Sequence, residues 1–271
     1  MGTQRINSIV YNDGERQAQV QELVVEAILH IKVNGVAYTT TVRTPGADEA
    51  LARGLLFTEG LYVDTTTEPT YRRILDPENG ELACLEVEVE PEDILKKLEN
   101  RRSAMASASC GLCGIREPEE VQIYGGPLQF STKEQLKVEQ IPMMMAQMEE
   151  QQLLFAATGG CHGAASFSSD ATLQFSFEDV GRHNAVDKVI GALLQSGQLD
   201  DATYLCISGR ISYEIVFKAY QAKIPFIAAV SAPTSLAVAT AEQFGLCLLG
   251  FCRDNRFTVY ANGDHILGIQ P

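Results

Sequence analysis

The sequence predicts an α/β protein, in which a C-terminal domain with a mostly parallel sheet follows a smaller N-terminal α+β part. From about residue 152, short apolar runs alternate with helical patterns, as they do in repeated β-α-β units. Before that point, strand-like and helical patterns mix without such a repeat. The 271 residues are 45% hydrophobic, which is enough for one large core or two modest ones. We therefore expect an N-terminal part at residues 1–125 and an α/β domain at residues 126–271.

The N-terminal part is expected to hold a hairpin, two helices and a further strand. Asn34-Gly35 between two apolar runs is a strong hairpin signal. The expected elements are a hairpin of residues 23–33 and 36–42, a helix at 48–62, a half-exposed strand at 82–89 and a short helix at 91–100. Residues 103–114, SAMASASCGLCG, are small and nearly uncharged, which indicates a flexible loop.

In the C-terminal domain, strands and helices are expected to alternate up to residue 251. The segment at 131–134, STKE, resembles a capping box, and it leads into a helix that Pro142 should kink or break. The expected strands are 172–177, 203–207, 225–230 and 246–251, and the expected helices are 184–195, 213–222 and 235–244. Cys206, Cys247 and Cys252 lie in apolar runs and should be buried thiols.

The overall charge and the apolar pattern exclude several classes of function. A formal net charge of −14 should repel nucleic-acid backbones, so we expect no nucleic-acid partner. No apolar run approaches the roughly 18 residues of a membrane-spanning helix, and residues 1–21 lack the apolar core of a signal peptide. We therefore expect a cytoplasmic protein without a membrane partner. Seven cysteines, an odd number, argue against a disulfide framework.

The motif Cys110-Gly111-Leu112-Cys113 is the most informative short pattern, and four interpretations of it stay open. A structural zinc site would need further ligands, such as Cys84, Cys161 or His162. A thioredoxin-like redox pair should open a helix after a strand, whereas this motif lies in a small-residue loop. Two unreactive thiols are the third interpretation, although the small neighbours argue against burial. The fourth is a sulfur carrier, whose exposed thiolate accepts persulfide sulfur and passes it on.

Polar residues cluster where several predicted strands meet the next helix. Arg182 and His183 are placed to bind an anion, with Asn184 as the cap of the helix. The segments 208–210 (SGR) and 231–235 (SAPTS) follow the next two strands, and their hydroxyls and free N–H groups suit phosphates. Each segment alone is equally an ordinary capped helix with a surface ion pair. Together they indicate a binding site, because ligands collect at the carboxyl ends of parallel strands.

Two further segments carry polar side chains that suit a site. Residues 251–256, FCRDNR, follow the last predicted strand, where two arginines either bind a ligand or form a charged turn. His162 lies in the Gly-rich turn 158–163, TGGCHG. A histidine there either orients a ligand and assists proton transfer or is a hydrogen-bonded turn residue. Cys161 beside it is either a third functional thiol or, as we expect, a residue that fills space.

Six segments together are similar to one known family. They are CGLCG at 110–114, TGGCH at 158–162, EDVGRHNAVDKVIG at 178–191, SGRISYEIVFKA at 208–219, SAPTSLAVATAE at 231–242 and GFCRDNRFTVY at 250–260. On these segments the chain resembles the formate dehydrogenase accessory sulfurtransferase family (FdhD type). The resemblance covers nearly the whole chain from the predicted hairpin onward, and EDVGRHNAVDK is long and specific.

This resemblance implies a sulfurtransferase that takes persulfide sulfur from a cysteine desulfurase. The acceptor would be the molybdenum or tungsten cofactor with two molybdopterin guanine dinucleotides, which then activates formate dehydrogenase. Cys110 would bear the persulfide, with Cys113 as its partner, and no permanent metal is expected. The residues that match the cofactor-contacting segment of the family are Phe251, Cys252, Arg253, Asp254, Asn255 and Arg256. The family fold resembles cytidine deaminase, and its members form homodimers.

Two other functions compete with this one. A zinc-dependent nucleobase deaminase would need H-x-E followed by P-C-x-x-C. No histidine of the chain is followed two positions later by Glu, and Ser109 rather than Pro precedes Cys110. A non-catalytic chaperone, which binds the cofactor or formate dehydrogenase without moving sulfur, fits the sequence but leaves Cys110 without a purpose. Replacement of Cys110 by Ala separates the chaperone from the carrier.

Overall fold

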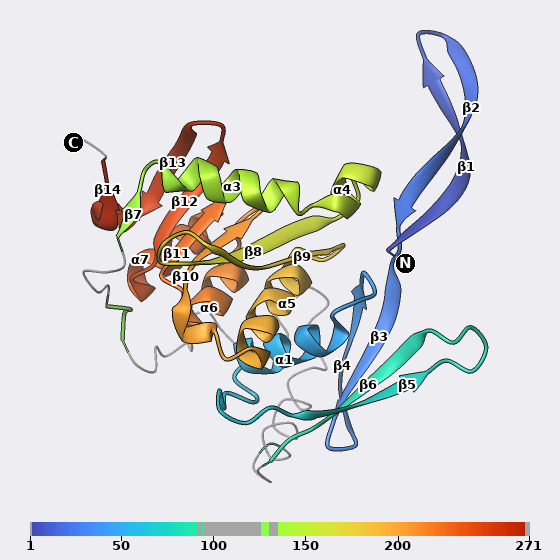
Figure 1. Cartoon of the computed structure of the whole chain (residues 1–271), viewed down its shortest axis with the longest axis horizontal. Helices are drawn as coiled ribbons and strands as arrows, with labels where there is room; N and C mark the ends of the chain where they lie inside the picture. The colour runs from blue at the N-terminus through green and yellow to red at the C-terminus, as the bar shows by residue number, and fades with distance from the viewer. Residues whose placement is uncertain (1, 91–93, 95–125, 130–134, 269–271) are drawn as a thin grey trace.

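A computed structural model describes residues 2–90, 94, 126–129 and 135–268 of the chain (Figure 1). Several predictions concern segments outside these residues. They are the helix at 91–100 apart from Ile94, the loop at 103–114 with Cys110 and Cys113, and the capping box at 131–134.

Six strands form the large sheet of the C-terminal part, in the order β13-β12-β11-β10-β8-β9. They are β8 (His162–Ser168), β9 (Leu173–Asp179), β10 (Ala202–Ile207), β11 (Phe226–Ala229), β12 (Cys247–Arg253) and β13 (Arg256–Ala261). Only the neighbours β10–β11 and β11–β12 are parallel, whereas the other three pairs of this sheet are antiparallel. The prediction of a mostly parallel sheet is therefore wrong.

Two hairpins bring in most of the antiparallel pairing. Residues 169–172 connect β8 to β9, and Asp254-Asn255 connects β12 to β13. The prediction contained neither β8 nor β13. The sequence of β8, HGAASFS, consists mostly of small residues, so its strand signal is weak. An apolar run also does not reveal whether its neighbour in the sheet is parallel or antiparallel, because that depends on contacts remote in sequence.

Helices cover both faces of this sheet. One face is covered by α3 (Gln140–Glu150), and the other by α5 (Arg182–Gln195), α6 (Tyr213–Gln221) and α7 (Ser235–Phe244). The short helix α4 (Leu153–Thr158) follows α3 and buries no residue. Successive residues of a strand point to opposite faces. Accordingly Leu205 and Ile207 pack in a core with α5, α6 and α7, whereas Tyr204 and Cys206 pack in a second core with α3. Figure 1 shows α3 and α5 on opposite sides of the strands.

Short elements complete the C-terminal part. A 3-10 turn (Leu199–Asp201) precedes β10, and another (Gly263–His265) follows β13. β7 (Leu136–Lys137) pairs in parallel with β14 (Ile266–Leu267). The predicted kink at Pro142 is wrong, because α3 begins at Gln140 and Pro142 lies in its first turn. A first-turn residue has no intrahelical N–H bond to lose, so proline is tolerated there.

The N-terminal part contains a four-stranded sheet in the order β4-β3-β6-β5 and one described helix. Its elements are β3 (Ala27–Val33), β4 (Val36–Arg43), α1 (Asp48–Thr58), β5 (Thr70–Leu75) and β6 (Leu82–Glu88). The hairpin at Asn34-Gly35 is confirmed, and both residues have positive φ, 48° and 79°. The prediction of half-exposed acidic positions in β6 is wrong for Glu86, which is 7% exposed and pairs with Arg72 of β5.

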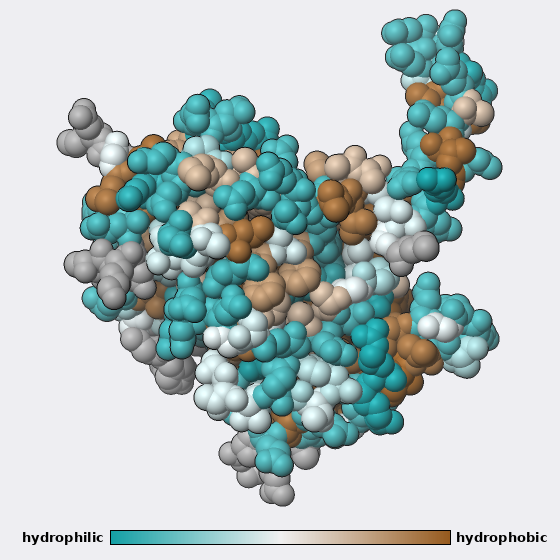
Figure 2. All heavy atoms as spheres, in the orientation of Figure 1, coloured by the Kyte–Doolittle hydropathy of each residue, from teal (hydrophilic) through white to brown (hydrophobic). Residues whose placement is uncertain are grey.

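A two-stranded ribbon, absent from the prediction, precedes this sheet. It consists of β1 (Thr3–Asn12) and β2 (Glu15–Val24), which are joined by Asp13-Gly14, a recognised hairpin signal. Figures 1 and 2 show the ribbon extending away from the rest of the chain, with a mainly hydrophilic surface. Its tip is therefore remote from both sheets.

The two parts meet where α1 crosses α5 at very short range. A Cβ on Gly54 would lie 1.9 Å from the carbonyl oxygen of Asp187, and one on Gly191 would lie 1.8 Å from that of Ala50. Only glycine permits this approach of two helix backbones. Beside the crossing, the buried ammonium of Lys218 donates to Asp187 and to Thr58 Oγ1, at 2.8 and 2.9 Å. α1, α5 and α6 are thereby joined.

We predict that Gly54→Ala lowers the free energy of unfolding by at least about 1–3 kcal/mol, the usual cost of overpacking a core. The added methyl meets backbone atoms of α5, which cannot rotate away as a side chain can. Urea denaturation checks the expectation, with Ala239→Ser on the exposed side of α7 as the control. Equal stability of Gly54→Ala and the wild type would show that the helices separate without cost.

Candidate functional site at the carboxyl ends of the parallel strands

Three segments lie side by side at the carboxyl ends of β10, β11 and β12, and we call these segments, at 208–210, 231–235 and 251–256, the rim. Backbone hydrogen bonds connect them in sheet order. The N–H of Ile211 donates to Ala232 O at 3.2 Å, and the N–H of Phe251 donates to Ser231 O at 3.2 Å. The three segments that the sequence indicated separately therefore form one continuous surface.

The start of β8 and the end of β9 reach the same rim, because β8 is antiparallel to its neighbour β10 and β9 is antiparallel to β8. Gly163 N donates to Ser208 Oγ at 2.9 Å, and Ser208 N donates to Gly163 O at 2.9 Å. His162 pairs with Asp179, the last residue of β9. The prediction of a turn at His162 is thus wrong, since this residue is the first of β8. The antiparallel hairpin brings both His162 and the 178–183 segment to the rim.

Basic side chains gather at this point of the rim. A Cβ on Gly209 would lie 3.4 Å from His162 Nδ1 and 3.6 Å from two carbons of Arg182, so Gly209 separates these side chains. The pKa of His162 is lowered, first by burial and then by the positive charges of Arg182, His183 and Arg210. The Nε of Arg182 is buried and has no hydrogen-bond partner among the described residues. An anion at this position would give that donor a partner.

His183 is held by an acidic partner that the sequence analysis missed. Its Nε2 lies 2.9 Å from Glu214 Oε2 and 3.2 Å from Ser212 Oγ. Ser212 Oγ also donates to Glu214 at 3.2 Å. The bond to His183 lowers the pKa of Glu214. The signal in the sequence was the Ser-x-Glu pattern at the start of α6, which is typical of a helix N-terminus.

The starts of three helices face the rim, with different caps. α5 begins at Arg182 with Gly181 as its N-cap, so the prediction that Asn184 caps it is wrong. Asn184 instead donates to Val42 O of β4 at 2.8 Å, which ties the N-terminal sheet to α5. α6 follows Ser212 as predicted, and α7 follows Thr234, whose hydroxyl accepts from the N–H of Ala237 at 3.2 Å. Their free N–H groups favour anions.

The predicted cofactor-contacting segment, Phe251 to Arg256, forms the tip of the β12–β13 hairpin. Phe251 is 44% exposed and has a φ of 54°, a conformation that is unusual for an aromatic residue. Both arginines and the turn between them are also exposed. Cys252 differs, because its side chain is 2% exposed and packs in the core beneath α3. Burial raises the pKa of this thiol to about 11.

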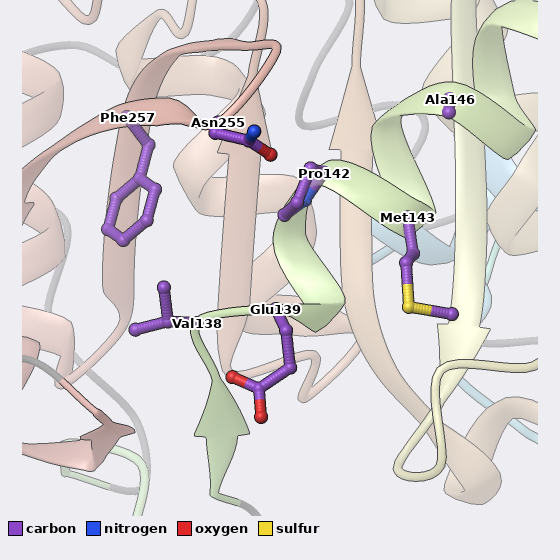
Figure 3. Close-up of a pocket in the computed structure, with 7 residues that line it drawn as sticks. All are labelled: Val138, Glu139, Pro142, Met143, Ala146, Asn255 and Phe257. Carbon is purple, nitrogen blue, oxygen red and sulfur yellow. The ribbon is translucent and has the colours of Figure 1, made fainter.

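One residue of the 251–256 segment, Asn255, also lines a cavity of about 690 Å³ beside α3. Figure 3 shows Asn255 above the gap between the hairpin and the first turn of α3. The other lining side chains are mostly apolar, among them Pro142, Met143 and Phe257. This cavity has few groups that could bind a charged ligand, in contrast to the rim.

All five cysteines in the described part of the chain are buried free thiols: Cys84, Cys161, Cys206, Cys247 and Cys252. The predicted burial of Cys206, Cys247 and Cys252 is confirmed. Burial raises the pKa of Cys247 to about 12. Burial also raises the pKa of Cys161 to about 12. The carboxylate of Glu178, which accepts a hydrogen bond from this thiol at 3.2 Å, raises the pKa further. Cys161 and Cys247 therefore stay protonated at neutral pH.

Two other kinds of feature are absent from the described residues. No group of three or more His, Cys, Asp or Glu side chains there is arranged to hold a metal ion. No helix among those residues is long and apolar enough to cross a membrane.

Comparison with known proteins identifies relatives over nearly the whole chain. The model of the FdhD/NarQ family matches residues 24–267. The protein named sulfur carrier protein FdhD of Mycolicibacterium paratuberculosis is 38% identical over 257 residues, which are 93% of this chain and 94% of that protein. The protein of the same name from Corynebacterium efficiens is 40% identical, with 88% of each chain covered.

A solved structure has a similar fold. It is a crystal structure from Desulfotalea psychrophila, assigned as a formate dehydrogenase accessory protein. The TM-score is 0.75 at 24% identity, and the match covers 98% of this chain and 99% of that one. The arrangement of both sheets therefore has a counterpart in a crystal structure.

We predict that the stabilising contribution of Glu214 depends on pH. Its pKa lies below the ordinary value of 4.5 in the folded chain, so the ionised carboxylate stabilises the fold above that pH. This contribution is lost as the pH falls through the lowered pKa. Glu214→Gln should lower stability at neutral pH by about 1 kcal/mol or less, as for a partly exposed pair, and the difference should vanish in acid.

Urea denaturation over a pH series measures this difference. Glu242→Gln, on the exposed surface of α7, is the control and should change stability little at any pH. A loss for Glu214→Gln that is the same at neutral and acid pH would contradict an ionised Glu214.

Proposed function

The chain belongs to the FdhD/NarQ family, and we propose on that basis that it is a sulfur carrier that serves formate dehydrogenase. Relatives at 38–40% identity are named sulfur carrier proteins, and their similarity extends over most of both chains. The structural counterpart is assigned as a formate dehydrogenase accessory protein. The proposed reaction is the transfer of persulfide sulfur through a cysteine of this chain.

The observation that carries the proposal is that every cysteine in the described residues is buried. A sulfur carrier needs a thiolate that a donor can reach, and burial in apolar surroundings opposes both requirements. The cysteines that remain are Cys110 and Cys113 in the small-residue segment CGLCG. We therefore assign the transferred sulfur to Cys110 and a supporting role to Cys113.

The proposed chemistry has two steps. First, the Cys110 thiolate attacks the terminal sulfur of a persulfide on a cysteine desulfurase. A new S–S bond forms on Cys110, and the desulfurase cysteine leaves as a thiolate. Second, the Cys113 thiolate attacks Cys110 Sγ, so that a Cys110–Cys113 disulfide forms and hydrosulfide leaves toward the acceptor. A cellular dithiol then reduces this disulfide and is oxidised in exchange.

The proposed acceptor is the molybdenum cofactor with two molybdopterin guanine dinucleotides, bound as a substrate at the rim. Several basic groups there suit its phosphates, since guanidinium groups form paired hydrogen bonds with phosphate oxygens. Arg253 and Arg256 are exposed on the hairpin, and Arg182 has an unpartnered buried donor. Phe251, Asp254 and Asn255 would contact the rest of the ligand, and Cys252 would contribute only its backbone.

Further expectations accompany this proposal. The donor would be a cysteine desulfurase, the client formate dehydrogenase, and the carrier a cytoplasmic homodimer with a fold similar to cytidine deaminase. The alternative is a non-catalytic chaperone of formate dehydrogenase. Both functions bind the same cofactor, but only the carrier forms a persulfide.

We predict that incubation with a cysteine desulfurase and cysteine adds one sulfur atom to the Cys110 peptide of the full chain. Mass spectrometry of the intact protein and its peptides measures this addition, and treatment with a reductant should remove it. Cys110→Ala should lose the added sulfur completely and should no longer activate formate dehydrogenase. Cys84→Ala is the matched control, because it removes a buried thiol and should keep the addition.

Two results would overturn the proposal. Sulfur on Cys161 with none on Cys110 would show that the carrying residue is wrong. No addition in the wild type, together with full activation of formate dehydrogenase by Cys110→Ala, would establish the chaperone instead.

A further inference from the structure

A second cavity, of about 640 Å³, lies in the N-terminal part, and none of its lining residues belongs to the rim. It is open to solvent and is lined by residues from the base of the β1–β2 ribbon, the turn that leads from β4 into α1, and the β5–β6 hairpin. Four charged side chains line it: Arg43, Asp48, Arg73 and Glu81. Such a cavity is polar enough to bind a charged ligand.

Arg43 is the unusual member of this set, because it is an arginine with only 1% of its surface exposed. Its Nε donates to Asp48 Oδ1 at 2.6 Å, and its Nη2 donates to Leu82 O at 3.3 Å. Its Nη1 is also buried, yet no described residue accepts a hydrogen bond from it. Buried donors are nearly always paired in native proteins, so this one needs an explanation.

Other groups of the cavity also favour an anion. Arg73 is half exposed, and its Nη2 lies 4.0 Å from Asp48 Oδ2, so the two guanidinium groups flank the same carboxylate. The Nη1 of Arg73 also lies 3.5 Å from Glu49 Oε1, a partly exposed carboxylate that does not line the cavity. The cavity also holds Gly46 and Asp48 at the start of α1, an 11-residue helix without a side-chain cap. The first N–H groups of a helix carry partial positive charge. An acceptor in this cavity would therefore meet two guanidinium groups and a helix N-terminus.

The acidic residues of the cavity restrict the class of anion. Asp48 is already bound by Arg43 and by the N–H of Gly46, at 2.6 and 3.4 Å. Its charge and that of Glu81 remain in the cavity and would repel a second negative charge on a ligand. A single carboxylate matches the guanidinium fork in shape, whereas a phosphate dianion would meet this repulsion.

From these observations we propose that the cavity is a binding site for a small monocarboxylate, held by Arg43 and Arg73. The carboxylate would accept from the free donor of Arg43 and from the guanidinium of Arg73. Arg72, the neighbour of Arg73 on β5, pairs with Glu86 and does not line the cavity. It therefore takes no part in the proposed binding. This site is separate from the rim and does not depend on the proposed sulfur transfer.

The test uses the full chain and acetate as the probe, observed by saturation-transfer NMR of its methyl protons. The dissociation constant should rise about tenfold in Arg73→Gln, which corresponds to the loss of one charge-assisted hydrogen bond. Arg72→Gln is the matched control, since it removes the same charge one residue away and should leave acetate binding unchanged. Arg43→Lys keeps a cation beside Asp48 but removes the Nη1 donor, and it should abolish binding.

Circular dichroism and urea denaturation establish whether each variant is folded. If Arg43→Lys is unstable, the comparison of Arg73→Gln with Arg72→Gln still tests whether the cavity binds acetate. Inorganic phosphate should bind more weakly than acetate at neutral pH, and methylammonium should not compete. The proposal fails if the wild type gives no acetate signal at millimolar concentrations. Equal weakening by Arg72→Gln and Arg73→Gln would show a general charge effect, and tighter binding of phosphate would show that the ligand class is wrong.

Discussion

The close crossing of α1 and α5 fixes the relative position of the two parts of the chain. Because the glycines at the crossing admit no side chain, the helix backbones themselves are the contact, and neither helix can slide without a steric clash. α5 also provides Arg182 and His183 at its first turn, on the rim. The packing of an N-terminal helix therefore determines where two basic side chains of the candidate site lie, although α1 contributes no residue to that site.

Buried charges reinforce the same arrangement. Lys188 of α5 lies 2.7 Å from Asp179, the last residue of β9, and donates to Thr44 O at 2.9 Å. Asp179 in turn accepts from the N–H of Thr44 at 3.1 Å. A buried ion pair adds little net stability, but the removal of one partner leaves an uncompensated charge and costs several kcal/mol. This network thus selects one arrangement of β4, β9 and α5, and it holds Arg43, which precedes Thr44, beside its cavity.

The sequence predicted those features that depend on local patterns. The bounds of α7 and the turn at Asn34-Gly35 agree with the structure because caps, turn residues and apolar spacing act over a few positions. Strand direction, the Glu214–His183 pair and the buried state of Arg43 were not predictable, because each depends on contacts between segments remote in sequence. The convergence of the rim was predicted from parallel strands, but the antiparallel β8–β9 hairpin also contributes to it.

The charges of the rim bear on the proposed binding of a phosphate-rich cofactor by an acidic protein. The formal net charge of the chain is −14, so long-range attraction of a phosphate-rich ligand is not available from the surface as a whole. At the rim, however, arginines supply the positive charge, and arginine keeps its proton throughout the physiological range. His162 among them has a lowered pKa and is neutral at neutral pH, so it offers hydrogen bonding without adding to the repulsion between these cations. On the protein side, the positive charge of the rim is therefore carried mainly by a few arginines, which suits the proposed binding of a phosphate-bearing ligand while chemistry proceeds at a thiol.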